Sequence, residues 1–405
     1  MSTMLNDPRL VTSEPQDGGP IATLRRRLAF TDLGQLPVII GLLVIWIIFQ
    51  IANPNFLTPL NLTNLLLQYV ALGILAVGII LVLLLGEIDL SVGATSGLCA
   101  GAMAVLNVKL GVPGPVAVLI ALLLGLAVGL LQGLWISKLR VPSFIVTLSG
   151  WLAWQGGLLL LLGSTGTINL RDPFILGLTN TFFPPEVGLI IAILFVAAYA
   201  GFAVWDRQRR LAAGLAAVGT GTLVARIALL AVPVVGGVLV LNANRGLPLA
   251  VCILIGMIVV FNFITKRVRY GRHIYAVGGN AEAARRASIN VDWVRLSVFA
   301  ICSTLAAFGG VMGASRLLAV NQSSGSGDLL LNVVAAAVIG GTSLFGGRGT
   351  IWAALLGALV IGSISNGMDL LALQSSTKYM ITGGVLLLAV TIDAVARRRR
   401  EATGR

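Results

Sequence analysis

Long apolar stretches separated by short polar segments recur along almost the whole sequence. A transmembrane helix needs about 20 predominantly apolar residues, and most of the stretches approach or exceed that length. The stretches at 93–108 and 329–345 fall short of it, so we expect half-helices or re-entrant segments there. The pattern predicts an all-α polytopic membrane protein with about 10–12 transmembrane helices, some of them broken or re-entrant. The twelve stretches are 37–52, 65–86, 93–108, 115–137, 143–162, 188–205, 214–241, 247–265, 293–315, 329–345, 350–367 and 379–395.

Positively charged residues are distributed unevenly between the segments that join these stretches. If the N-terminus is cytoplasmic, 22 of the 28 Lys and Arg residues lie on the cytoplasmic side, five lie on the other side, and Arg226 lies within a stretch. Cytoplasmic loops of membrane proteins carry an excess of Lys and Arg. Both termini are therefore predicted to be cytoplasmic, and the basic run at 397–400 agrees.

Two polar tails flank the apolar part of the chain. Residues 1–36 are expected to form a cytoplasmic N-terminal tail, residues 37–396 the transmembrane domain, and residues 397–405 a cytoplasmic C-terminal tail. No small-residue cleavage site follows the stretch at 37–52. This stretch is therefore expected to be an uncleaved first crossing rather than a signal peptide.

The composition narrows the class of protein further. Hydrophobic residues make up 57% of the 405 residues, charged residues only 11%, and the mean hydropathy is +0.97. This excludes a cytosolic enzyme, a secreted disulfide scaffold and a disordered chain. The net charge of +13 is interpreted as the cytoplasmic surplus of a membrane protein, and no nucleic-acid partner is expected. With one histidine, three cysteines inside apolar stretches and no P-loop motif, we expect no catalytic residues, no metal site and no cofactor.

Glycines recur at intervals of four residues in several stretches. Residues at this spacing lie on one face of a helix, and small residues there let two transmembrane helices approach closely. The pattern therefore predicts a tightly packed bundle. The three series are Gly93, Gly97 and Gly101; Gly125, Gly129 and Gly133; and Gly309 and Gly313.

A polar segment, GEIDLSVG at 86–93, interrupts two apolar stretches. Carboxylates at this position in a membrane protein are costly and indicate a role. Asp89 or Ser91 would cap the helix that begins near Gly93, or Glu87, Asp89 and Ser91 would line or gate a water-filled path through the membrane. The two roles can coexist.

Four amide side chains in or next to apolar stretches are candidate site residues: Asn64, Gln68, Asn332 and Asn366. An isolated amide in a membrane helix often forms a hydrogen bond to a neighbouring helix. Together the four are candidates to line a path for a hydroxyl-rich solute, because an amide both donates and accepts hydrogen bonds.

A second glycine-rich interruption, GGTSLFGG at 340–347, resembles the first. Aligning Asp89-Leu90 with Ser343-Leu344 places Gly93 against Gly347. The match is short, and it hints at an internal repeat of a helix–break–helix unit, which is common in transporters.

The longest polar segment with internal order lies at 266–292 and is cytoplasmic by the charge distribution. Gly278 and Gly279 are expected to break the chain, Asn280 is a good N-cap, and residues 281–287 are strong helix formers. We expect a short surface helix there. Such a helix is either a solvated connector or a docking element for a cytoplasmic partner, and the ordered break, cap and helix favour docking.

Five motifs in order along residues 57–393 resemble the permease subunits of bacterial ATP-binding-cassette importers for monosaccharides, in the ribose/xylose branch and most closely its xylose permeases. The resemblance rests on GEIDLSVG (86–93), VPSFIVTL (141–148), GRHIYAVGGNAEAAR (271–285), AAAVIGGTSLFGGRG (335–349) and the LLLAV stretch that ends at Asp393.

This resemblance implies a homodimer of all-helical permeases in the bacterial inner membrane. It also implies two copies of a cytoplasmic ATPase, an extracytoplasmic sugar-binding protein, and a monosaccharide substrate such as xylose or another pentose. The residues that match the ATPase-coupling region are Gly278, Gly279, Asn280, Glu282, Ala283 and Ala284.

Two departures from the family pattern stand out. The family often carries acidic residues just before its VIGG motif, where this chain has Leu330 and Asn332, which puts a sugar-contact role of those acids in doubt. The docking helix usually ends in Ser-Gly-Ile, where this chain has Ala287-Ser288-Ile289, so a slightly different helix exit is expected.

The expected mechanism is alternating access driven by ATP hydrolysis in a separate subunit. The alternative is a proton-coupled secondary transporter that uses Glu87 and Asp89 as a proton relay and needs no ATPase. A membrane enzyme acting on a lipid-linked substrate would need convergent acids, bases or metal ligands. A chain with one histidine and few carboxylates argues against that class.

Overall fold

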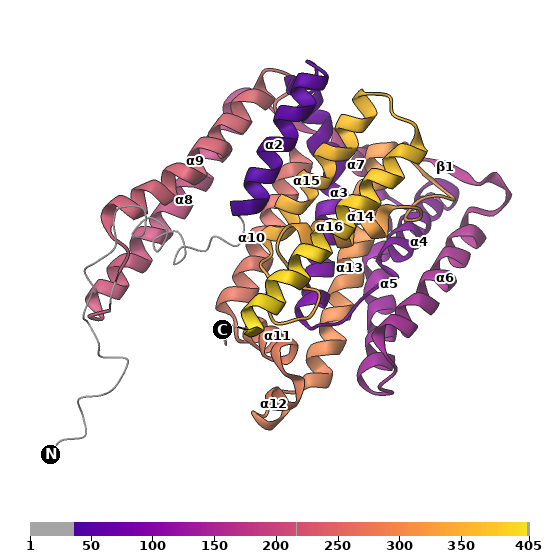
Figure 1. Ribbon diagram of the computed structural model, residues 1–405. Helices are drawn as coiled ribbons and strands as arrows, with labels where there is room; N and C mark the ends of the chain where they lie inside the picture. Colours follow the sequence, from indigo (N-terminus) through magenta and orange to yellow (C-terminus); the bar gives the residue numbers. More distant parts are fainter. Residues whose placement is uncertain (1–35, 216, 403–405) are drawn as a thin grey trace. The chain divides into compact units, whose positions relative to one another are not determined.

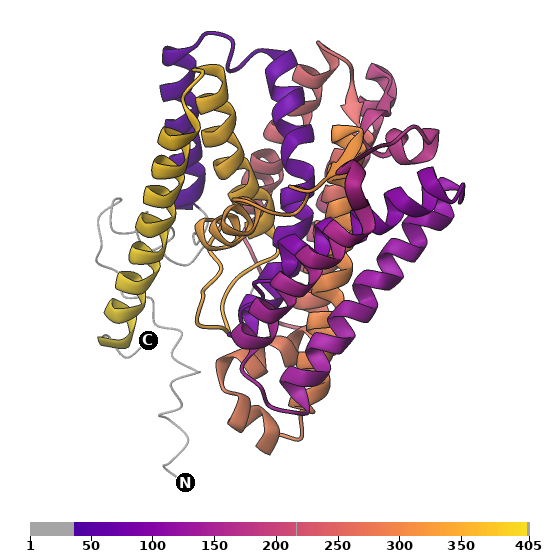
Figure 2. The same cartoon turned by 90° about the vertical axis from the view of Figure 1, so that its right-hand side faces the viewer.

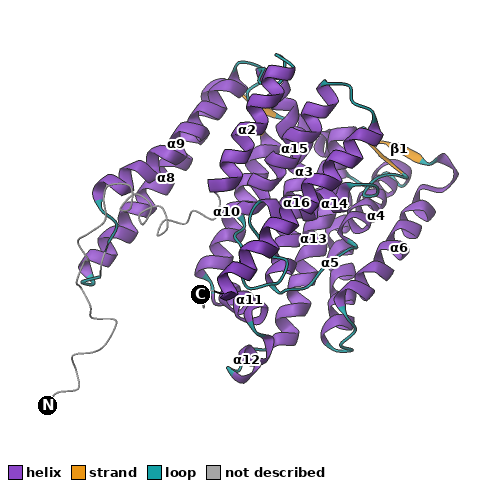
Figure 3. Ribbon diagram, viewed as in Figure 1, coloured by secondary structure: helices purple, strands orange, loops and turns teal. Residues whose placement is uncertain are grey.

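The computed structural model describes the backbone of residues 36–215 and 217–402, and almost all of it is helical (Figure 1, Figure 2, Figure 3). Nine of the described helices are long and apolar enough to cross a membrane, and two further apolar helices are shorter, α2 (Leu36–Ala52) and α14 (Leu329–Ile339). The prediction of an all-α polytopic membrane protein is confirmed. The nine are α3 (Pro59–Leu84), α4 (Val92–Ala104) with the π-helical turn η2 (Val105–Lys109), α5 (Gly114–Ser137), α6 (Ser143–Leu162), α8 (Pro185–Ala212), α9 (Thr220–Asn242), α10 (Leu249–Arg267), α13 (Val291–Leu317) and α15 (Trp352–Leu370).

The other elements lie between or after these helices. The chain ends in α16 (Ser375–Ala402), and three short helices are α7 (Pro173–Asn180), α11 (Arg269–Gly279) and α12 (Ala281–Arg286). A 3₁₀ turn, η3 (Gly163–Thr165), follows α6. Two short antiparallel pairs join the ends of helices: β1 (Thr167–Asn169) pairs with β4 (Ala319–Asn321), and β2 (Phe182–Phe183) pairs with β3 (Leu247–Pro248).

Helix α3 is surrounded by other helices. Every residue from Leu72 to Leu84 is buried, as expected for a segment that is apolar on all sides. It packs against α13, α15, α14 and α10, which together form the main hydrophobic core. An element that contacts so many others is well placed to transmit a displacement of its end to the rest of the bundle.

The predicted glycine series mark close helix contacts. On α5, a Cβ at Gly129 would lie 2.6 Å from the Cα of Ala300 on α13, and one at Gly133 would lie 2.9 Å from the Cα of Leu296. The backbones of α5 and α13 therefore touch along this face, as small residues at a four-residue spacing allow. On α4, Gly97 lies against the carbonyl of Ser324 in the loop after β4.

Helices α8 and α9 form a hairpin that differs from the rest of the bundle. They pack against each other, but only 11% and 6% of their most apolar parts are buried. A small apolar cluster that contains Val238 and Leu241 joins one end of the hairpin to α3 and α10. Most of the hairpin surface is therefore apolar and exposed, as expected for helices that face lipid.

Asp172, the N-cap of α7, connects α7 to η2 and to the start of α5 by hydrogen bonds. Its Oδ1 accepts hydrogen bonds from the N–H groups of Phe174 and Ile175, and its Oδ2 accepts from Asn107 Nδ2 at 3.1 Å and from the Gly114 N–H at 3.0 Å. Partial burial raises the pKa of this carboxyl, but the four hydrogen bonds outweigh burial and lower the pKa below its ordinary value.

Most predicted stretches coincide with helices, and the stretch at 143–162 matches α6 residue for residue. The expected half-helix at 329–345 is confirmed, because α14 ends at Ile339 and at 11 residues spans only about 16 Å. The half-helix expected at 93–108 is not found, because α4 and η2 together form an 18-residue candidate span. The loop from 340 to 351 follows it. The predicted N-terminal tail lies outside the described residues except for Leu36, and so do the last three residues of the predicted C-terminal tail.

Candidate functional site

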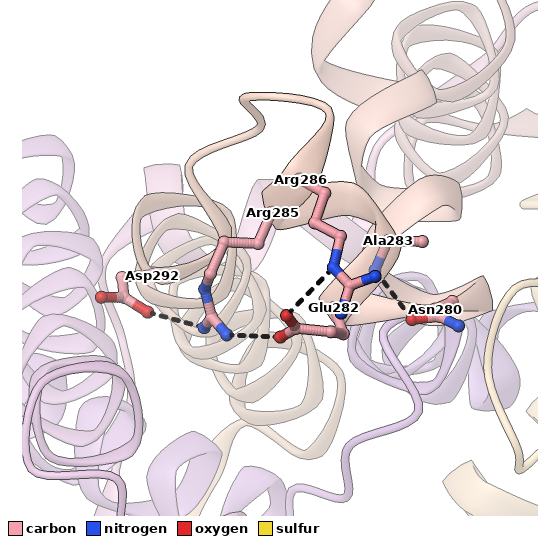
Figure 4. A network of polar contacts seen from close by, with 6 residues as sticks. All are labelled: Asn280, Glu282, Ala283, Arg285, Arg286 and Asp292. Carbon is pink, nitrogen blue, oxygen red and sulfur yellow. Dashed lines mark hydrogen bonds and ion pairs between the residues drawn. The ribbon is translucent and has the colours of Figure 1, made fainter.

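The predicted short surface helix is present as α12 and follows directly on α11 (Figure 4). Its docking role stays a prediction. Asn280 caps it, because its Oδ1 accepts a hydrogen bond from the Ala283 N–H at 2.9 Å. Glu282 in the first turn forms ion pairs with Arg285 at 3.4 Å and with Arg286 at 3.5 Å. All three charged side chains are at least half exposed, so the pairs add little stability. Their main effect is to fix which charges the helix presents to solvent.

One side of α12 is attached to the bundle. Ala284 is buried in the main core, and Ala281 and Ile289 pack against the same core. Ala283, next to Ala284 in the sequence, is exposed. The helix thus has an anchored face and a free face, which is the arrangement a docking element needs.

The exit of α12 uses a left-handed residue. Ser288 has φ +63°, and the Ile289 N–H donates to the Ala284 carbonyl at 3.1 Å while the Ser288 N–H donates to the Arg285 carbonyl at 3.0 Å. This is a Schellman motif, whose left-handed position favours glycine. Ser288 thus takes a conformation that glycine adopts readily, and the different helix exit expected from this departure stays a prediction.

Gly278 and Gly279 do not break the chain, contrary to the prediction. Both lie in the last turn of α11, and the break comes at Asn280, which has φ −162° and ψ 102°. Glycine is needed at position 278 because the backbone of α11 lies against two other backbone segments there. A Cβ at this position would overlap the carbonyl oxygen of Leu84, at the end of α3, and would lie 2.8 Å from the nitrogen of Gly347. Around Gly279 a Cβ would meet nothing within 4 Å.

Four glycines bring three segments together at this point. We name Gly86, Gly278, Gly346 and Gly347 the glycine junction. Gly86, Gly346 and Gly347 have φ of +75°, +83° and +69°, which L side chains rarely adopt. A Cβ on Gly346 would lie 2.6 Å from the Gly278 carbonyl oxygen and 2.9 Å from the Gly86 nitrogen. The junction thus joins α11 to both of the interruptions noted in the sequence.

Two hydrogen bonds hold the junction. The Gly347 N–H donates to the Leu84 carbonyl at 2.9 Å, and the Tyr275 hydroxyl on α11 donates to the Gly349 carbonyl at 2.8 Å. Burial raises the pKa of Tyr275, which keeps the hydroxyl protonated as a donor. Displacing α11 would therefore act on the end of α3 and on the loop before α15 at once.

The carboxylate of Glu87 lies beside a cation from another helix. Its Oε1 is 3.0 Å from an Nη atom of Arg295, near the start of α13, and the two side chains are 16% and 27% exposed. A mostly buried carboxylate next to a guanidinium is compensated in charge. The structure therefore places Glu87 in an ion pair between the first interruption and α13.

Asp89 and Ser91 interact with each other and with α5. Asp89 is buried, and its Oδ1 accepts hydrogen bonds from the Ser91 N–H at 2.8 Å and from the Ser91 hydroxyl at 2.7 Å. Gln132 Nε2 donates to the Ser91 hydroxyl at 2.9 Å. The Ser91 carbonyl accepts a hydrogen bond from the Thr95 N–H at 2.8 Å, but neither the Asp89 nor the Ser91 side chain accepts one from the first turn of α4. The predicted helix cap is therefore wrong, and the two residues instead link the interruption to α5.

The four predicted amides are not gathered in one place. Asn366 is buried on α15 and exchanges hydrogen bonds of 2.8 and 3.1 Å with Asn61 on α3, so it joins two helices. On α3, Asn64 is exposed and Gln68 is half-buried. Of the four, Asn332 lines a polar cavity.

That cavity lies between α14, α15 and α16 and has a volume of about 200 Å³. Asn332 Nδ2 donates to Asp328 Oδ2 at 2.9 Å, and Lys378 forms an ion pair with Asp369. The Asn332 Oδ1 is buried without a hydrogen-bond partner among the described residues. The cavity offers carboxylates, hydroxyls, an amide and an ammonium group, which suit a small solute with several hydroxyls. Its polar lining residues are Asp328, Asn332, Ser365, Asp369, Ser375, Lys378, Tyr379 and Thr382.

Some contributors were not predicted from the sequence. Arg295, Gln132 and Asp328 each pair with a predicted site residue, and α11 is a helix that the sequence did not predict within the segment at 266–292. Asp328 could have been found, since it lies one helical turn before Asn332. Nothing in the sequence joins Glu87 to Arg295 or Ser91 to Gln132, which lie on separate helices.

The comparisons with known proteins identify relatives over most of the chain. The family model described as "Branched-chain amino acid transport system / permease component" matches residues 61–390. The chain is 39% identical over 344 residues to a xylose transport system permease protein of Escherichia coli, covering 85% of this chain and 87% of the relative. It is 36% identical over 374 residues to a xylose transport system permease protein of Haemophilus influenzae, covering 92% and 99%.

A ribose import permease protein of Bacillus subtilis is 32% identical over 374 residues, covering 92% of this chain and 97% of the relative. No solved structure matches the sequence significantly.

Proposed function

This chain belongs to the family of branched-chain amino acid transport system permease components, and on that premise we propose that it is the membrane-spanning subunit of an ATP-driven sugar importer in the bacterial inner membrane. The relatives named for xylose and ribose support a monosaccharide as substrate, and the higher identity to the xylose proteins favours xylose or another pentose. ATP is hydrolysed by a separate cytoplasmic subunit, and a sugar-binding protein delivers the substrate from outside. Two copies of the chain form a homodimer around the path.

The glycine junction is the observation that carries this proposal. It connects α11, and through it the exposed α12, with the end of α3 and with the loop before α15. A push on α12 by a bound ATPase is passed on through backbone contacts, which cannot yield by side-chain rotation. Packed elements of this kind switch between discrete arrangements rather than deforming continuously. Alternating access follows when the two interruptions move with α11.

The polar cavity between α14, α15 and α16 supports a hydroxyl-rich substrate. By the charge distribution, the end of α15 and the start of α16 lie on the extracytoplasmic side. Asp328 stands one turn before Asn332 and supplies a carboxylate close to the positions where the family often carries acids. We infer that a sugar leaving its binding protein contacts this cavity. Asp328 would then supply the acidic group that the family often carries where this chain has Leu330 and Asn332.

The proton-coupled alternative is less well supported. A relay needs carboxyl groups that can exchange protons with each other and with solvent. Glu87 is paired with Arg295, whereas Asp89 is buried and bonded to Ser91. The two neighbouring carboxyls thus have separate partners.

The docking role is tested on the free face of α12. Ala283→Trp places a large side chain on an exposed position next to the buried Ala284, so the bundle should fold while the docking surface is blocked. Ala212→Trp, at the exposed end of α8, is the matched control. We expect Ala283→Trp to lower both ATPase co-purification and sugar uptake at least about tenfold, a loss of about 1.4 kcal/mol in binding. Equal co-purification and uptake for the two variants would refute docking at α12.

A further inference from the structure

A basic pocket with aromatic walls lies between the cytoplasmic ends of α8 and α10. It has a volume of about 450 Å³ and is lined by residues of α8, of the turn after it and of α10. Its cations are Arg209, Arg210 and Arg267, and its aromatic side chains are Phe202, Trp205 and Phe263.

The charges in this pocket are not balanced by the protein. Asp206 is the one carboxylate lining it, with Oδ2 3.0 Å from Arg210 Nε and Oδ1 3.6 Å from an Nη atom of Arg267. The guanidinium of Arg209 lies 4.8 Å from the ring centre of Trp205 and pairs with no carboxylate among the described residues. Three cations against one anion leave a net charge of about +2, which attracts an anion.

The surroundings of these cations are those of a lipid site rather than an aqueous one. Trp205 and Phe263 are 48% and 57% exposed, on helices whose apolar surfaces are themselves exposed. Aromatic residues with basic neighbours at the cytoplasmic end of a membrane helix mark the level of the lipid headgroups. Basic pockets between helices on this side suit anionic lipid headgroups.

Arg207 differs from its neighbours and shows that the cluster is not simply a basic end of α8. Its Nε donates to the Val218 carbonyl at 3.0 Å and an Nη donates to the Thr220 hydroxyl at 3.1 Å. This arginine closes the hairpin turn between α8 and α9. The others, by contrast, face the pocket with α10 on the opposite side.

We propose that this pocket binds the phosphate headgroup of an anionic phospholipid, with the acyl chains lying along the exposed apolar surfaces of α8 and α10. The headgroup would bridge Arg209 and Arg210 to Arg267 and so fix the cytoplasmic end of the hairpin on the bundle. The inference is independent of the proposed transport function, because none of these residues takes part in the glycine junction or in the polar cavity.

Native mass spectrometry of the purified protein tests the proposal. Phosphatidylglycerol and phosphatidylethanolamine with identical acyl chains are added in turn, and the bound fraction is measured for the wild type and for a variant with Arg209, Arg210 and Arg267 changed to Gln. A second variant with Lys138, Arg140 and Arg272 changed to Gln removes three exposed cytoplasmic cations elsewhere. Each cation near the membrane surface contributes to attraction of anionic lipid.

We expect phosphatidylglycerol to bind in preference to phosphatidylethanolamine, and its affinity to fall at least about tenfold in the first variant and to stay unchanged in the second. Equal affinity in the two variants, or no preference between the lipids, would overturn the proposal. Displacement of the lipid by inorganic phosphate at equal concentration would show that the pocket recognises phosphate alone, and this would overturn it too.

A second readout does not depend on the arginine variants folding well. Brominated phosphatidylglycerol quenches tryptophan fluorescence at short range, and the quenched fraction should shrink in Trp205→Phe. An unchanged quenched fraction in this variant would place the lipid elsewhere and contradict the proposal.

Discussion

Adding one methyl group to Gly278 should damage the protein, whereas adding it to the next residue should not. Both glycines lie in the last turn of α11 in helical conformation, so Gly→Ala brings the same gain in helix propensity, about 0.5–1 kcal/mol, at each. The difference between the two variants therefore isolates the contact at 278.

The size of that difference follows from the surroundings. A Cβ at Gly278 overlaps the Leu84 carbonyl oxygen and lies 2.8 Å from the Gly347 nitrogen, so α11 must move away from α3. Overpacking of this kind costs about 1–3 kcal/mol. Loss of the hydrogen bond between Gly347 and Leu84 adds about 1 kcal/mol. A Cβ at Gly279 meets nothing within 4 Å. We expect Gly278→Ala to be less stable than Gly279→Ala by about 2–4 kcal/mol.

Thermal unfolding of the two purified variants in detergent, followed by tryptophan fluorescence, measures this ordering. Sugar uptake should fall with Gly278→Ala and stay near the wild-type level with Gly279→Ala, because only the first disturbs the glycine junction. Equal melting temperatures and equal uptake for the two variants would refute the account of the junction.

Three further changes test other contacts of the fold. Asp172→Asn should lower the melting temperature at pH 7, where the wild-type carboxyl is charged because its pKa is lowered. The difference in melting temperature from wild type should shrink below about pH 4, because the wild-type carboxyl becomes protonated there. A difference that does not depend on pH would contradict this. Gly129→Leu should reduce the amount of folded protein in the membrane, because α13 leaves no room for a side chain there. Gly156→Leu should not reduce it, because a Cβ at Gly156 meets nothing within 4 Å. Similar yields of the two variants would count against the contact between α5 and α13. Ser288→Gly should stabilise the protein by about 1 kcal/mol by relieving its left-handed backbone, and a lower melting temperature would argue against that conformation.

The sequence predicted the helices well because apolar length is a local property. The stretch at 143–162 gave α6 without error, and the weak stretch at 329–345 proved to be the short α14. The short helix α12 was also predictable, since the cap at Asn280 and the helix-forming residues after it are local signals.

What the sequence could not supply is which segments meet. Gly278 was interpreted as a break, because glycine has the same local signature whether it ends a helix or admits a neighbouring backbone. The pairing of Glu87 with Arg295 and that of Ser91 with Gln132 depend on how helices pack, and no local pattern indicates them. The predicted cap by Asp89 or Ser91 failed because the Asp89 carboxylate accepts hydrogen bonds from Ser91 itself, and the Ser91 hydroxyl is bonded to Gln132 on α5.

The central claim is that ATP hydrolysis in a partner subunit drives sugar through this chain. The most direct test is xylose accumulation in proteoliposomes that contain this protein, its partner ATPase and its sugar-binding protein. We predict accumulation that requires ATP inside the compartment where α12 is exposed, persists when the pH gradient is collapsed, and is lost with Ala283→Trp. Accumulation that follows an imposed pH gradient without ATP would contradict the account.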